Sequence, residues 1–329
     1  MRMSRPNMVA RAVGGRGGLP TPGNHIEASS ACKLKAGRTT SRLVQNCQAR
    51  HRQSNRSSET SSCRCRQSGY NVPMLVIPLQ SGSNGNCIYV EARDTRLLFD
   101  AGISGKAARE RLAGFDRSID DVDAVFISHD HSDHARCAGI YQRKFGLPIH
   151  VTHRTLAAAS RRYDLGRIDA VHHFDAGATI PFNGITIETI CTPHDGVEGV
   201  AFVVDDGRYR LGILTDLGHV FDGLLEVVRS LDAVVIESNY DPDMLDGGSY
   251  PPHLRERIRG PGGHLSNDQA AGLLAQTNGR LQWACLGHLS EENNRPELAL
   301  DSHRRIVGDD RFPICMASRY RAAGPFEVG

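Results

Sequence analysis

The sequence predicts an α/β protein with β-sheets inside and helices outside. After residue 73, short apolar runs rich in β-branched residues come first, helical segments follow, and β-rich runs return. Several runs, such as Ala233–Glu237, are apolar at nearly every position, as strands are when both faces of their sheet are covered. This order of elements gives stacked layers around a common core.

Turn signals bound the expected strands. Asn84-Gly85 and Asp206-Gly207 are the dipeptides most typical of hairpin turns. The runs between such signals are four to six residues long, which is the usual length of a strand. The predicted strands cover residues 75–79, 87–91, 96–99, 124–128, 185–190, 200–204, 209–214, 233–237 and 283–286.

Capping residues mark some of the expected helices. Ser104 can cap a first helix, and Gly114 can end it. The segment Ser266-Asn267-Asp268-Gln269 reads as a capping box that opens an apolar helix. The predicted helices cover residues about 104–113, 134–145, 154–160, 220–230, 266–277 and 296–307.

Charge divides the chain near residue 73. Residues 1–73 carry 13 Lys and Arg but 2 Asp and Glu, whereas residues 74–329 carry 26 and 35. The first segment has hardly an apolar run, so we expect a disordered tail followed by one ordered domain over 74–329. The tail could be a basic nucleic-acid-binding arm, an organelle transit peptide, or the product of translation from too early a start. Met74 immediately precedes the first strand, which favours the third interpretation.

The sequence argues against a membrane-spanning protein and against a secreted protein. No stretch approaches the roughly 18 apolar residues that a membrane span needs, and the tail lacks the apolar core of a secretory signal. Five cysteines after residue 73 are isolated, mostly within apolar runs, which is typical of reduced cysteines rather than a disulfide framework. We therefore expect a soluble cytoplasmic protein with no membrane partner. The sequence does not determine its oligomeric state.

The most informative residues are Ser128-His129-Asp130-His131-Ser132-Asp133-His134, which follow the predicted strand 124–128. Three imidazoles and a carboxylate within six residues of one turn are not explained by packing. Neutral imidazole and carboxylate are the ligands that zinc and similar metals select. The turn therefore predicts a metal site at the end of a strand.

This turn resembles the signature His-x-His-x-Asp-His of the metallo-β-lactamase superfamily, residue for residue. The resemblance implies an αββα sandwich of two mixed sheets. It also implies two divalent ions, Zn²⁺ or Mn²⁺, that share a hydroxide nucleophile, with Asp133 orienting that hydroxide as well as binding metal. Later strand ends supply Thr192-Pro193-His194, Thr215-Asp216 and Gly287-His288. The implied ligands are His129, His131 and His194 for the first ion, Asp133, His134 and His288 for the second, and Asp216 as the bridge.

Motifs in the second half resemble those of RNase Z, the tRNA 3′-processing endonuclease. They are Glu237-Ser-Asn-Tyr240, Gly263-His264-Leu-Ser266 and Gly287-His288-Leu-Ser290. The resemblance implies that Glu237 and His264 lie near the scissile phosphate as catalytic residues. His264 precedes a helix N-terminus, which favours an anion there. Two alternatives stay open: a structural or capping histidine at 264, and a carboxylate at 237 that bonds a neighbouring histidine.

The whole of residues 75–325 resembles the WalJ/YycJ-type branch of the superfamily. Ser81-Gly-Ser-Asn-Gly-Asn-Cys87 and the two His-Leu-Ser motifs carry this resemblance. It implies a metal-dependent 5′-to-3′ exonuclease acting on double-stranded DNA, with DNA favoured over RNA as substrate. The acidic balance of residues 74–329 is unusual for a nuclease, since phosphate attracts cations. The alternatives are a small-molecule hydrolase of thioesters or lactams, and a non-catalytic regulatory protein that keeps metal.

Overall fold

Two mixed β-sheets form the centre of the computed structural model, which describes residues 72–329. The first sheet has the strand order β14-β1-β2-β3-β4-β5-β6, and the second has the order β13-β12-β11-β10-β9-β8-β7. The strands of the first sheet are β1 (Met74–Gln80), β2 (Cys87–Ala92), β3 (Thr95–Phe99), β4 (Ala124–Phe126), β5 (Ile149–Val151), β6 (Val171–His173) and β14 (Phe326–Val328). Those of the second are β7 (Thr179–Phe182), β8 (Ile185–Cys191), β9 (Val200–Asp205), β10 (Arg210–Leu214), β11 (Ala233–Glu237), β12 (Trp283–Gly287) and β13 (Ile314–Met316).

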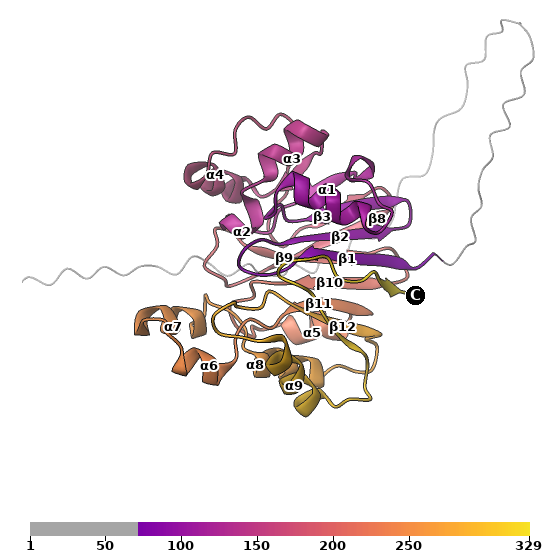
Figure 1. Ribbon diagram of the computed structural model, residues 1–329. Helices are drawn as coiled ribbons and strands as arrows, with labels where there is room; N and C mark the ends of the chain where they lie inside the picture. Colours follow the sequence, from indigo (N-terminus) through magenta and orange to yellow (C-terminus); the bar gives the residue numbers. More distant parts are fainter. Residues whose placement is uncertain (1–71) are drawn as a thin grey trace, which may run out of the picture. The chain divides into compact units, whose positions relative to one another are not determined.

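Helices cover the outer face of each sheet (Figure 1). The first sheet is covered by α1 (Gly105–Ala113), α3 (Ala138–Phe145) and α4 (His153–Arg162). The second is covered by α5 (Leu224–Arg229), α8 (Asn267–Ala275) and α9 (Pro296–Val307). The short elements η1 (Ile119–Asp121), α2 (Ser132–Ala135), α6 (Pro242–Gly247) and α7 (Pro252–Arg259) lie in the connections.

The apolar side chains form three layers that match this arrangement. One cluster lies between the sheets, where Phe99 and Phe126 meet Phe202. A second lies between the first sheet and its helices, and a third lies between the second sheet and its helices. Because both faces of both sheets are buried, the central strands can be apolar at nearly every position, as β11 is up to its last residue, Glu237.

Both sheets change from antiparallel to parallel pairing at the same relative place. In the first sheet β3, β4, β5 and β6 are parallel, and in the second β10, β11, β12 and β13 are parallel. Strand β8 also runs in the direction of β10, because two antiparallel pairings separate them. The carboxyl ends of these strands therefore share one edge within each sheet, where open α/β sheets usually bind ligands.

The predicted four-layer αββα architecture is confirmed. Ser104 caps α1, the capping box of Ser266 and Gln269 opens α8, and Asp206-Gly207 turns the chain between β9 and β10. The sequence analysis missed β5, β6, β7, β13 and β14, which are three or four residues long. These short strands lie toward the sheet edges, and some carry His or Pro, so they lack the apolar run on which prediction relied.

Two predicted helices are corrected. The segment 134–145 is two helices, α2 and α3, separated at Arg136 and Cys137. The segment 220–230 is helical over Leu224–Arg229 alone, because Gly223 has a left-handed backbone with φ of 88° just before it. Strand β4 ends at Phe126 rather than at residue 128. Ser128 therefore lies in the turn after the strand, where it contacts Asp100.

The predicted tail of residues 1–73 lies outside the described residues, except for Val72 and Pro73. No helix among residues 72–329 is both long and apolar enough to cross a membrane. Strand β1 begins at Met74 and pairs between β14 and β2 in the first sheet. We predict that a truncated chain starting at Met74 has the same melting temperature and the same turnover as the full chain. A large loss of DNA affinity on truncation would instead identify a basic arm.

Candidate metal centre

The predicted ligands all follow the carboxyl ends of strands, one in the first sheet and three in the second. His129, His131, Asp133 and His134 come after β4, the latter two within α2, and His194 follows β8. Asp216 follows β10, and His288 follows β12. The fold thus brings together residues that are up to 159 positions apart in the chain, as their numbers in the sequence show. The structure places every one of the seven predicted ligands in one of the side-chain groups that could hold a metal ion.

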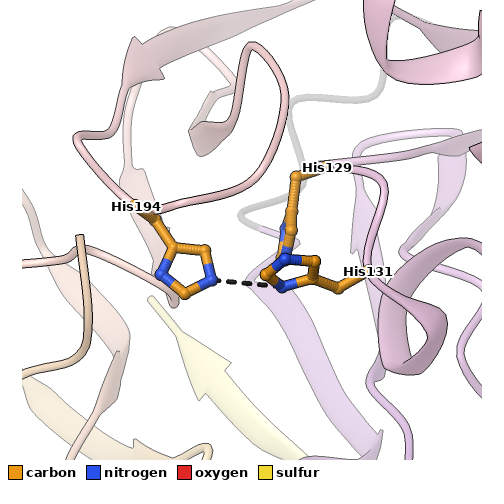
Figure 2. A group of neighbouring side chains, drawn as sticks. All are labelled: His129, His131 and His194. Carbon is orange, nitrogen blue, oxygen red and sulfur yellow. Dashed lines mark hydrogen bonds between the residues drawn. The ribbon is translucent and has the colours of Figure 1, made fainter. Parts of the chain in front are cut away.

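One group consists of three histidines (Figure 2). The rings of His129 and His131 come from one segment and face His194 from another, with ring centroids 4.6–5.1 Å apart. Nε2 of His194 lies 3.3 Å from Nδ1 of His131. The other nitrogen of His194, Nδ1, lies 2.8 Å from the carbonyl oxygen of Gly263, so it donates there and leaves Nε2 free to bind.

A second group consists of Asp133, His134 and His288. Nε2 of His134 and Nε2 of His288 each lie 3.4 Å from Oδ2 of Asp133. Asp216 lies between the two groups: its Oδ2 is 3.2 Å from Nε2 of His134, and its Oδ1 is 3.6 Å from Nε2 of His194. A carboxylate in that position could be shared by ions held in the two groups.

Backbone strain accompanies this arrangement. Asp216 and His288 have φ values of 56° and 52°, and Asp100 at the end of β3 has 67°. Non-glycine residues rarely adopt this left-handed region, and each such residue costs on the order of 1 kcal/mol or more. The surrounding bonds must therefore hold the chain in this form, as is common at functional sites.

The donor set fits a bound cation. Nε2 of His129 and Oδ2 of Asp216 are buried without a hydrogen-bond partner among the described residues. Burial by itself raises the pKa of a carboxyl, yet His288, His134, His129 and His194 together hold the pKa of Asp216 well below its ordinary value. Burial lowers the pKa of His134, but the charges of Asp216, Asp100 and Asp133 outweigh burial and raise that pKa well above normal. The buried carboxylates around His134 therefore stabilise a positive charge at the centre.

Asp100 is a supporting residue that the sequence analysis missed. Its Oδ2 accepts from Nδ1 of His134 at 2.7 Å and from the hydroxyl of Ser128 at 3.0 Å. Its Oδ1 accepts the backbone N–H of Ser128 at 2.8 Å. This carboxylate fixes the ring of His134 with Nε2 toward the centre, the usual second contact of a metal-binding histidine. The available signal was a lone acidic residue after the apolar strand β3.

The Ser81–Asn86 loop, which joins β1 to β2, also supports the centre. The hydroxyl of Ser81 accepts the backbone N–H of His288 at 2.8 Å. At the other end of the loop, the side-chain amide of Asn86 lies 3.2 Å from Oδ2 of Asp133 and 3.0 Å from Nε2 of His134. Gly102 packs so closely here that a Cβ would lie 1.7 Å from the carbonyl oxygen of Asp133. The glycine- and asparagine-rich motif therefore contacts all three residues of the second group.

Two arginines hold outer parts of the first group. Arg257 of α7 pairs with Asp195 at 2.6 Å, and Asp195 lies 3.3 Å from Nε2 of His131. Arg162 of α4 pairs with the buried Asp130 at 2.7 Å. Asp130 in turn accepts the backbone N–H of Val197, which fixes the loop that carries His194. These two arginines are already bound to carboxylates.

Glu237 is fully buried, and both of its oxygens have partners. Oε1 accepts the backbone N–H groups of Leu217 and Leu265 at 2.9 and 3.0 Å, and Oε2 lies 3.1 Å from Nδ1 of His264. Of the two roles left open by the sequence, these contacts favour the carboxylate that bonds a neighbouring histidine over one that touches substrate. Glu237 positions the loop after Asp216 and the ring of His264.

His264 keeps one ring nitrogen for other partners. Its Nδ1 is taken by Glu237, and its ring centroid lies 4.9 Å from that of His194 and 5.3 Å from that of His288. Burial lowers the pKa of His264, but the hydrogen bond and charge of Glu237 together with Asp216 outweigh burial and raise it. The side chain is 20% exposed, and its Nε2 makes no hydrogen bond among the described residues.

Asparagines of the later motifs form a buried network. Asn267 accepts from the hydroxyl of Ser238 at 2.6 Å and from the amide of Asn294 at 2.8 Å. Asn239 donates to the carbonyl of His288 at 2.8 Å. The three motifs around Glu237, His264 and His288 are thereby tied together. No role for these asparagines in holding the site together was predicted from the sequence.

We predict that Asp100→Asn weakens metal binding by about 10- to 100-fold, because His134 loses its carboxylate partner. Asparagine tolerates the left-handed backbone at this position, so the fold should survive. Titration of the metal-loaded protein with a competing chelator measures the change. The exposed Asp94→Asn is the matched control. Equal metal affinity in the Asp100 and Asp94 variants would contradict the supporting role.

Comparison with known proteins shows the family to which the chain belongs. The family model of the Beta-lactamase superfamily domain matches residues 95–288. Exodeoxyribonuclease WalJ of Streptococcus pneumoniae is 40% identical over 226 residues, which are 67% of this chain and 83% of the relative. Exodeoxyribonuclease YycJ of Bacillus anthracis is 33% identical over 237 residues, 72% of this chain and 90% of the relative.

Among solved structures, the metallo-β-lactamase fold protein YhfI of Bacillus subtilis is similar, with a TM-score of 0.59 at 18% identity. The match covers 76% of this chain and 99% of that one. This structural similarity, at low sequence identity, concerns the fold alone. The sequence matches to WalJ and YycJ extend over most of the length of each relative. The chain belongs to the metallo-β-lactamase superfamily and, within it, to the family of WalJ and YycJ.

Proposed function

We propose that the protein is a metal-dependent exodeoxyribonuclease that degrades double-stranded DNA from the 5′ end. One observation carries most of the weight: two groups of candidate ligands meet at a shared carboxylate, Asp216. The relatives named exodeoxyribonuclease support DNA as the substrate. The direction of degradation rests on the resemblance to the WalJ/YycJ branch.

Two divalent ions, Zn²⁺ or Mn²⁺, would be held by these groups. His129, His131 and His194 would bind one ion, Asp133, His134 and His288 the other, and Asp216 both. Nitrogen and oxygen donors of this kind suit either metal. When bound, the ions would lower the pKa of water toward neutrality and neutralise charge on the attacked phosphate.

The chain's own residues would orient the reaction. Asp133 has Oδ2 near both His134 and His288, where it can accept a proton from the attacking water and direct its lone pair at phosphorus. Hydrolysis forms one P–O bond to that water and breaks the ester bond to the leaving oxygen, which must gain a proton. His264 can donate from Nε2 to that oxygen or to a non-bridging phosphate oxygen, since Glu237 holds its Nδ1.

The acidic balance of the domain does not oppose this proposal. Several acidic residues near the centre are paired with arginine, such as Asp130 with Arg162 and Asp195 with Arg257. Others are candidate ligands, whose charge two ions would compensate. The net charge of the domain therefore does not determine the local electrostatic potential at the candidate metal centre, where a DNA end would bind.

The experiment is a substrate panel with the metal-reconstituted protein. The proposal predicts cleavage of 5′-phosphorylated duplex DNA into mononucleotides from that end, with slower cleavage of RNA and no cleavage after chelation. Duplexes labelled separately at either end distinguish the direction on a gel. Turnover of a thioester or lactam without cleavage of DNA would establish the small-molecule hydrolase instead. Metal-independent DNA binding without cleavage would identify a regulatory protein.

A pair of variants separates catalysis from structure at His264. Asparagine can still donate to Glu237 as Nδ1 does, but it lacks the outer nitrogen, so His264→Asn should keep the melting temperature. Its turnover should fall by about 100-fold or more, the scale of one acid–base group. His264→Ala also leaves Glu237 partly unpaired, which costs about 1–3 kcal/mol of stability. A near-normal rate in the asparagine variant would overturn the catalytic assignment.

A further inference from the structure

A pocket of about 650 Å³ opens beside the strand end that carries His288. Ser81 lies in its wall, and the hydroxyl of this same serine accepts the backbone N–H of His288. Leu289 and Ser290, the next residues along the chain, also line it. The segment 316–323, which connects β13 toward β14, supplies a further part of the lining. The pocket is therefore a direct neighbour of the candidate metal centre.

The lining combines apolar and polar surface. Leu289, Met316 and Pro296 give apolar contacts, whereas Ser290 and Ser318 add hydroxyl groups. Pockets for small organic ligands have this mixture, and the volume lies within their usual range of about 300–1,000 Å³. A nucleotide has matching parts, namely a flat apolar base, a sugar with polar oxygens and a phosphate.

Tyr320 at the rim is the most exposed large apolar side chain among residues 72–329, at 65%. Its position is nevertheless fixed. The hydroxyl of Tyr320 donates to Glu291, and its carbonyl oxygen accepts from Arg111 at 2.8 Å. Arg319 ties the same segment to Glu291 and to the carbonyl of Leu289. An exposed aromatic ring on a held backbone is a suitable surface for stacking a base, since every base has a π-face.

Arg321 is exposed and makes no hydrogen bond or ion pair within the described part of the chain. It differs in this from Arg162 and Arg257, which are bound to carboxylates near the centre. An uncommitted guanidinium beside the pocket can bind phosphate with two parallel hydrogen bonds. The negative charge of Glu291 is already met by Arg319.

We propose that this pocket holds the terminal nucleotide of the DNA strand whose scissile phosphate lies at the metal centre. Tyr320 stacks on the base, and Arg321 binds the phosphate. The inference rests on the proposed nuclease function and assigns it a specificity site. The pocket would thus select a strand end, because a continuous duplex has no free nucleotide to place there.

The kinetic test compares Tyr320→Ala, Tyr320→Phe and Arg321→Ala in the full chain. On 5′-phosphorylated duplex DNA, the two alanine variants should raise KM about tenfold or more, the scale of one lost stacking or phosphate contact. Phenylalanine keeps the ring and should restore most of the affinity. Relative to bis(p-nitrophenyl) phosphate, a small diester without a base, kcat/KM for DNA should fall about tenfold in the alanine variants.

Arg208→Ala is the matched control, because Arg208 is exposed in the β9–β10 turn, at the end of β10 opposite Asp216. Its kinetics should equal those of the unaltered protein. Unchanged KM for DNA in both Tyr320→Ala and Arg321→Ala would overturn the proposal. An equal loss in Tyr320→Phe and Tyr320→Ala would also contradict stacking, since it would point to the bond with Glu291.

A binding measurement keeps the pocket testable if the protein cleaves no nucleic acid. Calorimetry with dAMP should show binding that is weakened about tenfold in Tyr320→Ala and unchanged in Arg208→Ala. Inorganic phosphate, which has no base, should bind both variants alike. Binding of dAMP without DNA cleavage would refute the nuclease function and retain the pocket. Equal dAMP binding in all variants would refute the pocket itself.

Discussion

The structure depends on the concentration of buried imidazoles and carboxylates at one edge of each sheet. Asp216 is 3% exposed and is surrounded by histidines, several of them equally buried. Removing such groups from water is costly unless each finds a partner of suitable charge and geometry. Divalent ions would compensate the carboxylates and use the free ring nitrogens at once. The left-handed backbone at Asp216 and His288 is a further cost that the same arrangement requires.

Supporting contacts extend outward from this centre in a regular way. Asp100 fixes His134, Gly263 fixes His194, and Glu237 fixes His264 and the loop after Asp216. Asp100 and Gly263 each contact Nδ1 of a candidate ligand histidine, and Glu237 contacts Nδ1 of His264 and a backbone N–H near Asp216. The loop Ser81–Asn86 contacts the three residues of the second group, Asp133, His134 and His288. The motifs that mark this family in sequence are thus mostly the parts that hold the ligands in place.

The sequence could indicate the candidate ligands because they occur as dense or ordered motifs at strand ends. Three histidines within six residues of one turn indicate metal binding far more strongly than packing, and His194, Asp216 and His288 follow in the expected order. It did not predict Asp100 or the pairing of Asp195 with Arg257, since each is a single polar residue whose partner is distant in the chain. Short edge strands such as β6 were missed because pairing, rather than an apolar run, defines them. The pocket beside His288 depends on three separate segments and has no signature in sequence.

The most direct test of the central claim is the number of metal ions per chain. Elemental analysis after reconstitution and removal of free metal should give two ions per chain for the unaltered protein. Replacing Asp216, the shared carboxylate, by Asn should weaken both ions together, whereas Asp100→Asn should weaken chiefly the one near His134. We predict two ions in the unaltered protein, weakened binding of both ions in Asp216→Asn, and weakening chiefly of one ion in Asp100→Asn. At most a trace of metal after reconstitution would contradict it.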